Sequence, residues 1–222
     1  MALILNIETA TKNCSVSLAD KGKTVSCQEI AEENFSHAEK LHVFIDDILN
    51  KNQCSYKDLK AIAVSQGPGS YTGLRIGVSA AKGLSYALNI PLIAVETLTI
   101  LAHKLNISDG FIVPMIDARR MEVYSAIFNS NFSLFREVKA EVIDKYSFSK
   151  INNNLHLIGD GTQKLKEVLT DEKFIFYQNI VYPSANEMAT ISYEKFLNKN
   201  FVDVAYFEPY YLKDFMGLKT TL

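Results

Sequence analysis

Runs of apolar residues divide the N-terminal part of the chain into three short strands. Residues 3–7 are almost entirely apolar, which is typical of a strand buried on both faces. Residues 14–19 alternate between apolar and polar side chains, which predicts a half-buried strand. The polar sequence at 20–23 favours a hairpin turn, so residues 24–30 are expected to return as a third strand.

Apolar residues at helical spacing come next. The segment Ser36–Asn50 is predicted to be a helix because five apolar side chains would share one of its faces: Leu41, Phe44, Ile45, Ile48 and Leu49. Ser36 and Glu39 match a capping box at its start. The rest of this half is expected to add a strand at 61–65, a helix at Thr72–Leu88, a strand at 92–95 and a helix at 97–105.

The second half of the chain repeats this order. It is predicted to contain strands at 111–116, 122–128, 132–138, 155–158 and 174–176, and helices at 162–169 and 184–197, the last begun by a capping box of Ser184 and Glu187. Two β-β-β-α-β-α units predict a duplicated α/β fold with a cleft between domains at 1–106 and 107–222. The aromatic C-terminal segment, about 206–222, is expected to pack back on the first half.

Composition restricts the classes of function. The chain has 222 residues, 48% of them hydrophobic, and a net charge of -2, with no basic stretch along the sequence that would indicate strong direct binding of nucleic acid. Its 3 cysteines form no CxxC pattern and are expected to be free thiols. No secretory leader or membrane-length apolar run is recognised, so a cytoplasmic protein with no membrane contact is expected.

A glycine-rich turn joins the predicted strand at 61–65 to the helix at Thr72–Leu88. Gly67 and Gly69 permit backbone angles that a side chain disfavours, and Ser70 or Thr72 can cap the helix. Such a turn either holds a phosphate or serves as a tight structural turn, and the absence of a Walker motif favours the structural interpretation. Further along the helix, Gly73, Gly77 and Ala81 share one face, which permits close approach of another backbone.

Five motifs together resemble one known family. They are Ile7–Thr11, Gln66–Gly77, Asp117–Tyr124, Gly159–Gly161 and Pro209–Leu212. With the duplicated topology, they resemble the actin-like ATPase (ASKHA) fold and, within it, the TsaB (YeaZ) family over the whole length of the chain.

The resemblance implies a role in tRNA modification. Members of that family are regarded as non-catalytic activators that dimerise with TsaD, the subunit that transfers threonylcarbamoyl to adenosine 37 of tRNAs reading codons that begin with A. TsaE, an ATPase, joins the complex, and TsaC supplies threonylcarbamoyl-adenylate. The resemblance therefore implies no cofactor of the chain's own, ATP bound by the complex, tRNA contacts made mainly by partners, and a homodimer when TsaD is absent.

The resemblance also implies where site residues would lie. Glu8, Thr9, Asp117 and Arg119 follow the first strand of each half, where actin-like enzymes hold a nucleotide, although Glu8 stands where Asp is commoner. TsaD holds a metal with two histidines four residues apart. His37 and His42 are five apart and point in different directions on a helix, so no metal site and no catalytic residue are expected. The alternatives are a free-standing ATPase or kinase, or a metal-independent peptidase.

The resemblance places the partner interface on the first two helices of the N-terminal half. The residues assigned to it are Leu41, Ile45, Tyr71, Gly73, Leu74, Gly77 and Ala81. The alternative is that these side chains all belong to the core, because the sequence does not say which apolar face of a helix meets which neighbour. The family usually carries Arg at the position of Lys213, so a bidentate pairing there is not expected of this chain.

Overall fold

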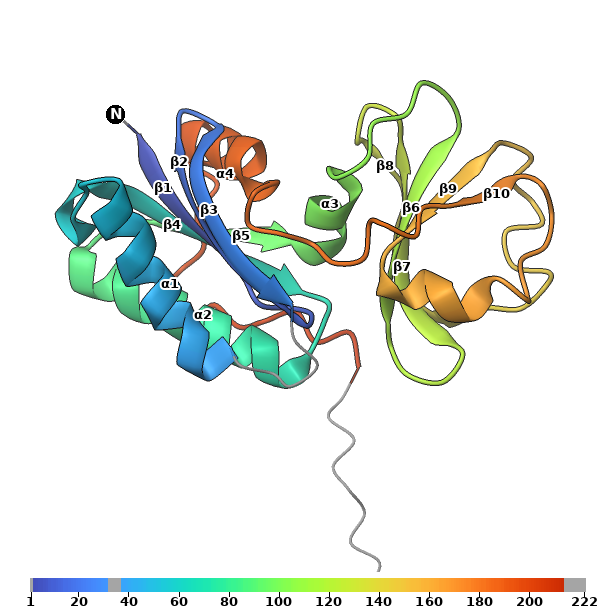
Figure 1. Ribbon diagram of the computed structural model, residues 1–222, viewed down its shortest axis with the longest axis horizontal. Helices are drawn as coiled ribbons and strands as arrows, with labels where there is room; N and C mark the ends of the chain where they lie inside the picture. Colours follow the sequence, from blue (N-terminus) through green and yellow to red (C-terminus); the bar gives the residue numbers. More distant parts are fainter. Residues whose placement is uncertain (1, 32–36, 214–222) are drawn as a thin grey trace, which may run out of the picture.

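The chain folds into two lobes, each built on a five-stranded mixed sheet (Figure 1). The computed structural model describes residues 2–31 and 37–213. The strand order of the first sheet is β3-β2-β1-β4-β5, and that of the second is β10-β9-β6-β7-β8. In each sheet the first strand of the lobe lies in the middle.

The two sheets have the same pairing pattern, which confirms the predicted duplication. In the first, β1 pairs antiparallel with β2 and parallel with β4. In the second, β6 pairs antiparallel with β7 and parallel with β9. The strands of the first sheet are β1 (Leu3–Glu8), β2 (Asn13–Asp20), β3 (Lys23–Ala31), β4 (Leu59–Gly67) and β5 (Leu92–Glu96). Those of the second are β6 (Phe111–Asp117), β7 (Glu122–Asn129), β8 (Leu134–Val142), β9 (Leu155–Ile158) and β10 (Phe174–Phe176).

Helices cover both faces of the first sheet, and one of them bridges the lobes (Figure 1). The two long helices α1 (His37–Lys51) and α2 (Tyr71–Leu88) share one core with the sheet. On the other face lies α4 (Met188–Leu197). The short α3 (Thr97–Ala102) contributes apolar side chains to the core of the second lobe as well. The predicted cap residue Ser36 falls outside the described residues. Within them, no helix is long and apolar enough to cross a membrane.

The second lobe has less helix than predicted. Residues 145–150, between β8 and β9, form turns where the first lobe has α1. The helix predicted at 162–169 is instead a 3₁₀ helix, η2 (Asp160–Leu165), followed by a turn. A second 3₁₀ helix, η1 (Tyr56–Asp58), precedes β4. The two units therefore share their strands and differ in the segments that connect them.

The segment before α4 is held on the first sheet by side chains of β2. Ser17 donates a hydrogen bond to the carbonyl of Ala185 (2.7 Å), and the Ser15 hydroxyl accepts one from the amide of Ala185 (2.9 Å). The polar face of β2 is thus buried, which corrects the half-buried strand predicted at 14–19. The polar side chains of β2 can be buried because the main chain of residues 183–187 makes the hydrogen bonds that water would otherwise make with them.

The predicted capping box of α4 is also wrong. The helix begins at Met188, and neither Ser184 nor Glu187 caps it with a side-chain hydrogen bond to its first turn. The Ser184 hydroxyl lies 3.2 Å from that of Ser15. A tertiary contact with the sheet therefore replaces the local cap.

The segment after α4 runs back along the first lobe. Val202 pairs with Leu92 at the edge of β5. Lys82 of α2 donates to the carbonyl of Phe207 (2.9 Å), and the amide of Tyr210 donates to the carbonyl of Gln66 (2.7 Å). α4 and the segment after it therefore lie against the first sheet, although they belong to the second half of the sequence.

Candidate functional site

The glycine-rich turn connects the end of β4 to the start of α2. Ser70 is the N-cap of α2, and its hydroxyl accepts a hydrogen bond from the amide of Gly73 (3.3 Å). The amide of Ser70 donates to the carbonyl of Ala10 (2.7 Å), and the amide of Gly67 donates to the hydroxyl of Thr97 (3.1 Å). Three of the amides that a phosphate would use are therefore bonded within the chain.

The space around this turn is filled by the chain's own backbone. A Cβ at Gly67 would lie 2.5 Å from the carbonyl oxygen of Tyr210. One at Gly69 would lie 2.8 Å from the Cβ of Ala10 and closer still to its carbonyl oxygen. These contacts explain the need for glycine: the residues after β1 and the C-terminal segment close the turn from two sides. The structural interpretation of the turn is the one that its contacts favour.

Glu8, at the end of β1, is completely buried. One carboxylate oxygen accepts a hydrogen bond from the amide of Ala10 (2.6 Å), and the other has no hydrogen-bond partner among the described residues. Burial raises the pKa of Glu8 to about 7, although the amide of Ala10, the hydroxyl of Ser65 and the charge of Lys104 act in the opposite direction. With a pKa of about 7, this buried carboxyl is about half protonated at neutral pH.

Thr9 packs against the small-residue face of α2. Its hydroxyl donates to the carbonyl of Gly73 (2.7 Å). A Cβ at Gly73 would overlap the carbonyl oxygen of Thr9, and one at Gly77 would overlap its hydroxyl oxygen. The face that was expected to receive a partner therefore receives the end of β1 of the same chain.

The other residues assigned to the partner interface are internal too, with one exception. Leu41, Ile45, Leu74 and Ala81 are at most 1% exposed, and all lie in the first lobe. Only Tyr71 is partly exposed, and its ring lies 4.9 Å from that of Tyr211. The expectation that these residues form an exposed face is thereby corrected: the spacing of apolar and small residues records packing on the lobe's own sheet.

The two histidines of α1 point to different environments. His37 is buried, and its Nε2 lies 2.7 Å from the carbonyl oxygen of Thr11. Burial lowers its pKa. His42 is exposed, and Leu41 fills the core position four residues after His37. Among the described residues, no group of three or more His, Cys, Asp or Glu side chains is arranged to hold a metal ion.

Asp117 and Arg119, in the second lobe, lie in a network of charged groups. The amide of Asp117 donates to the carboxylate of Asp160 (2.9 Å), and the amide of Arg119 donates to that of Asp117 (3.0 Å). Lys164 forms an ion pair with Asp117 and donates to the carbonyl of Glu122 (2.7 Å). Burial raises the pKa of Asp160 to about 6.

Sequence reasoning missed the partners in this network. Lys164 lies on η2, and Lys213, which forms an ion pair with Glu122, lies at the end of the described chain. No local spacing connects either lysine with its carboxylate. The Gly159–Gly161 motif was a usable signal, because the main chain at Gly159 approaches the carbonyl of Met115 too closely for any side chain and thereby places Asp160 beside β6.

Two cavities among the described residues border other side chains than those predicted to face a nucleotide. One, of about 350 Å³, is bordered by residues of both lobes, including Asn13, Glu29 and Lys104. The other, of about 420 Å³, lies over η2 beside Gly159 and Lys166. The residues predicted to face a nucleotide, namely Glu8, Thr9, Asp117 and Arg119, border neither cavity.

Comparisons with known proteins place the chain in a family. The family model described as "TsaD: tRNA N6-adenosine threonylcarbamoyltransferase" matches residues 29–214. The "tRNA threonylcarbamoyladenosine biosynthesis protein TsaB" of Bacillus subtilis strain 168 is 32% identical over 86% of this chain and 87% of that protein. The chain belongs to the TsaB/YeaZ family. The resemblance inferred from the motifs is thereby confirmed.

Further relatives support this TsaB/YeaZ assignment. The protein of the same name from Escherichia coli K12 is 28% identical over 97% of this chain and 96% of that protein. Among solved structures, "YeaZ from Pseudomonas aeruginosa" has a TM-score of 0.84 at 24% identity, covering 96% of this chain and all of that one. The predicted actin-like fold is confirmed by these structural relatives.

The transferase itself is a more distant relative of this TsaB-family chain. The "tRNA N6-adenosine threonylcarbamoyltransferase" of Bacillus subtilis strain 168 is 33% identical, but over only 42% of this chain and 31% of that protein. The relatives that match nearly the whole chain carry the name TsaB. The chain is therefore a member of a family named for tRNA threonylcarbamoyladenosine biosynthesis.

Proposed function

We propose that this chain is the non-catalytic activator subunit of the complex that adds threonylcarbamoyl to adenosine 37 of tRNA, and that it acts by pairing directly with a TsaD-type transferase. Family membership supports the pathway. TsaE would join this pair, and ATP would bind to the complex. Contacts with tRNA would come mainly from the partners.

The closed glycine turn carries this proposal. An actin-like enzyme that handles a nucleotide needs free amides and open space at its phosphate-binding turns. Here the amides of Gly67, Ser70 and Gly73 are bonded within the chain, and the main chain at Ala10 and Tyr210 occupies the space beside the turn. These contacts weigh against phosphate binding at the glycine turn.

At the turns after β1 and β6, where actin-like enzymes hold a nucleotide, the amide of Ala10 donates to Glu8 and that of Arg119 donates to Asp117. The two sets of contacts together weigh against a free-standing ATPase or kinase.

The peptidase alternative lacks an activated nucleophile at this turn. A serine nucleophile needs a base within hydrogen-bond reach. The hydroxyl of Ser70 instead accepts from the amide of Gly73, as an N-cap does. The buried His37 faces the carbonyl of Thr11. An accessory role is the function that this arrangement supports best.

The outer faces of α1 and α2 are the surface on which we place the transferase. Val43 of α1 is 52% exposed and Tyr86 of α2 is 83% exposed. Gly83 lies on α2 between Ser79 and Tyr86 and is exposed. A Cβ added at Gly83 would have nothing within 4 Å. Two helices can supply the roughly 800 Å² per partner that a specific interface buries. The same face would pair two copies when the transferase is absent.

Gly83→Arg tests this placement. The free space at Gly83 lets the variant fold, but a long charged side chain would hold the partner's helices away. We expect its affinity for TsaD to fall at least about tenfold, measured by titration calorimetry on purified proteins. Leu197→Arg is the matched control, because Leu197 is 60% exposed on α4, on the opposite face of the lobe. Equal affinity of Gly83→Arg and the control would contradict the placement.

A further inference from the structure

The hairpin between β6 and β7 presents two arginines in an unusual backbone conformation. Arg119 has a φ of 72° and Arg120 a φ of 52°, and both side chains are exposed. Residues other than glycine, asparagine and aspartate rarely adopt a positive φ, and two such residues in succession carry a conformational cost. The hairpin is still well paired, since the amide of Ala118 donates to the carbonyl of Glu122 (3.1 Å).

The carboxylates beside these arginines are already neutralised. Asp117 is paired with Lys164, and Glu122 is paired with Lys213. Within the described part of the chain, neither Arg119 nor Arg120 forms an ion pair of its own, so the two guanidinium groups are surplus positive charge.

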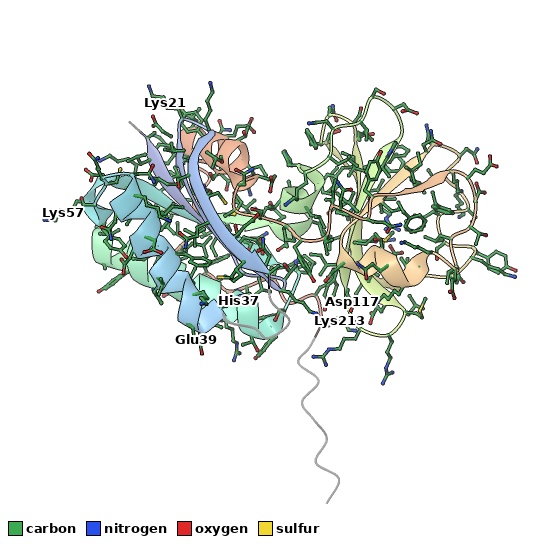
Figure 2. The ribbon with its side chains drawn as sticks, viewed as in Figure 1. Lys21, His37, Glu39, Lys57, Asp117 and Lys213 are labelled. Atoms are coloured by element: carbon green, nitrogen blue, oxygen red, sulfur yellow. The ribbon has the colours of Figure 1, made fainter. Side chains whose placement is uncertain are left out.

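The positive charge of Arg119 also acts on Tyr124, a side chain of β7. Burial raises the pKa of Tyr124, and the charges of Lys213 and Arg119 oppose that effect. Figure 2 shows Asp117 and Lys213 close together at the lower edge of the molecule, whereas Lys21 and Lys57 lie at the far side of the first lobe.

The C-terminal segment extends this positive surface onto α2. Tyr211, two residues before Lys213, has its hydroxyl 3.3 Å from the Nε of Arg75. The guanidinium of Arg75 lies over the ring of Tyr71, 4.1 Å from its centroid. Cations and aromatic rings therefore lie on α2, the C-terminal segment and the hairpin, with Lys213 shared with Glu122: Tyr71, Arg75, Tyr211, Lys213, Arg119 and Arg120.

We propose that these six residues, the basic–aromatic surface, contact the sugar–phosphate backbone of an RNA strand directly. Guanidinium groups match phosphate in charge and bidentate geometry, and aromatic rings between cations are typical of surfaces that follow a single strand. The net charge of the chain is -2, so this positive surface is local. The choice of RNA over an acidic peptide rests on the proposed function in tRNA modification.

A charge-removing variant that keeps the hairpin tests the proposal. Arg119→Asn with Arg120→Gly removes both cations and places there two residues that accept positive φ readily. Binding of a labelled, unmodified tRNA transcript to the full-length chain alone is measured by anisotropy over a series of salt concentrations. The slope of log K against log[salt] is expected to fall in magnitude by about 1.5, because each lost phosphate contact contributes about 0.7 to 0.9.

The control removes the same charge elsewhere. Lys21→Asn with Lys57→Gln takes two exposed cations from the far side of the first lobe, and Asn tolerates the φ of 49° at position 21. The proposal predicts an unchanged slope for this control. Arg119→Lys with Arg120→Lys should retain most of the slope, since charge is kept and only bidentate geometry is lost.

Three results would overturn the proposal. They are an unchanged slope in the arginine-free variant, an equal loss in the control, and a loss of binding to polyglutamate without any loss for tRNA; the last would assign the surface to an acidic peptide. Because the measurement uses the chain alone, its failure leaves the pairing with TsaD untouched. Failure of the Gly83→Arg test would likewise leave the RNA contact standing.

Discussion

Gly73→Ala is expected to lower the free energy of unfolding by about 2–3 kcal/mol, whereas Gly83→Ala, on the same helix, is expected to raise it by about 0.5–1 kcal/mol. Both changes replace a helical glycine with the best helix former, so propensity alone predicts stabilisation in both cases. The opposite signs follow from what each new methyl group would meet.

The Cβ at Gly73 would overlap the carbonyl oxygen of Thr9 and lie 3.3 Å from the ring of His37. Both neighbours are buried, and the hydroxyl of Thr9 also donates a hydrogen bond to the carbonyl of Gly73. The overlap can therefore be relieved only if α2 moves away from the sheet. Gly83 has nothing within 4 Å, so its alanine gains only helix propensity.

Urea unfolding of the two variants beside the wild-type chain measures both effects. Stabilisation by Gly73→Ala would show that the helix and the end of β1 are not packed as described. Because Gly83→Ala changes the same residue type on the same helix, it controls for propensity in this comparison.

Glu8→Gln is expected to stabilise the chain at pH 8 and to change its stability little at pH 5. The pKa of Glu8 is about 7 in the folded chain, above the usual value of 4.5. The stabilisation that comes from protonated Glu8 is therefore fully present below pH 4.5 and is lost as the pH rises through 7. Glutamine keeps the neutral state at every pH, so the variant avoids that loss.

The expected gain at pH 8 is on the order of 3 kcal/mol in the free energy of unfolding, since each pKa unit corresponds to about 1.4 kcal/mol. Urea unfolding at the two pH values measures it, with Glu39→Gln as the control because Glu39 is exposed on α1. A variant that is no more stable than the wild type at pH 8, or that gains equally at both pH values, would contradict the raised pKa of buried Glu8.

The strands and their duplication could be predicted because strand patterns report burial directly. The apolar run at 3–7 and the repeat of three strands before each glycine turn are local patterns, which a short stretch of the sequence is enough to reveal. The polar face of β2 was misjudged, because Ser15 and Ser17 look solvated until the backbone near Ala185 is placed on them. That contact joins residues about 170 positions apart, which no local pattern contains.

The partner surface could not be predicted for a related reason. Small residues four apart, such as Gly73 and Gly77, permit close approach of any backbone, whether from the same chain or from another protein. In this fold the neighbour is Thr9. The basic–aromatic surface was missed because Arg75, Arg119 and Lys213 are far apart in the sequence and form no charge run.

We propose that the chain supplies no chemistry and is nevertheless required by the transferase. The most direct test is threonylcarbamoylation of an adenosine-37 tRNA transcript by TsaC, TsaE and TsaD, with and without this chain. We expect product only when this chain and TsaD are both present, and none when TsaD is omitted. Product formed by this chain without TsaD would contradict this proposal, and so would undiminished product formed by TsaD without this chain.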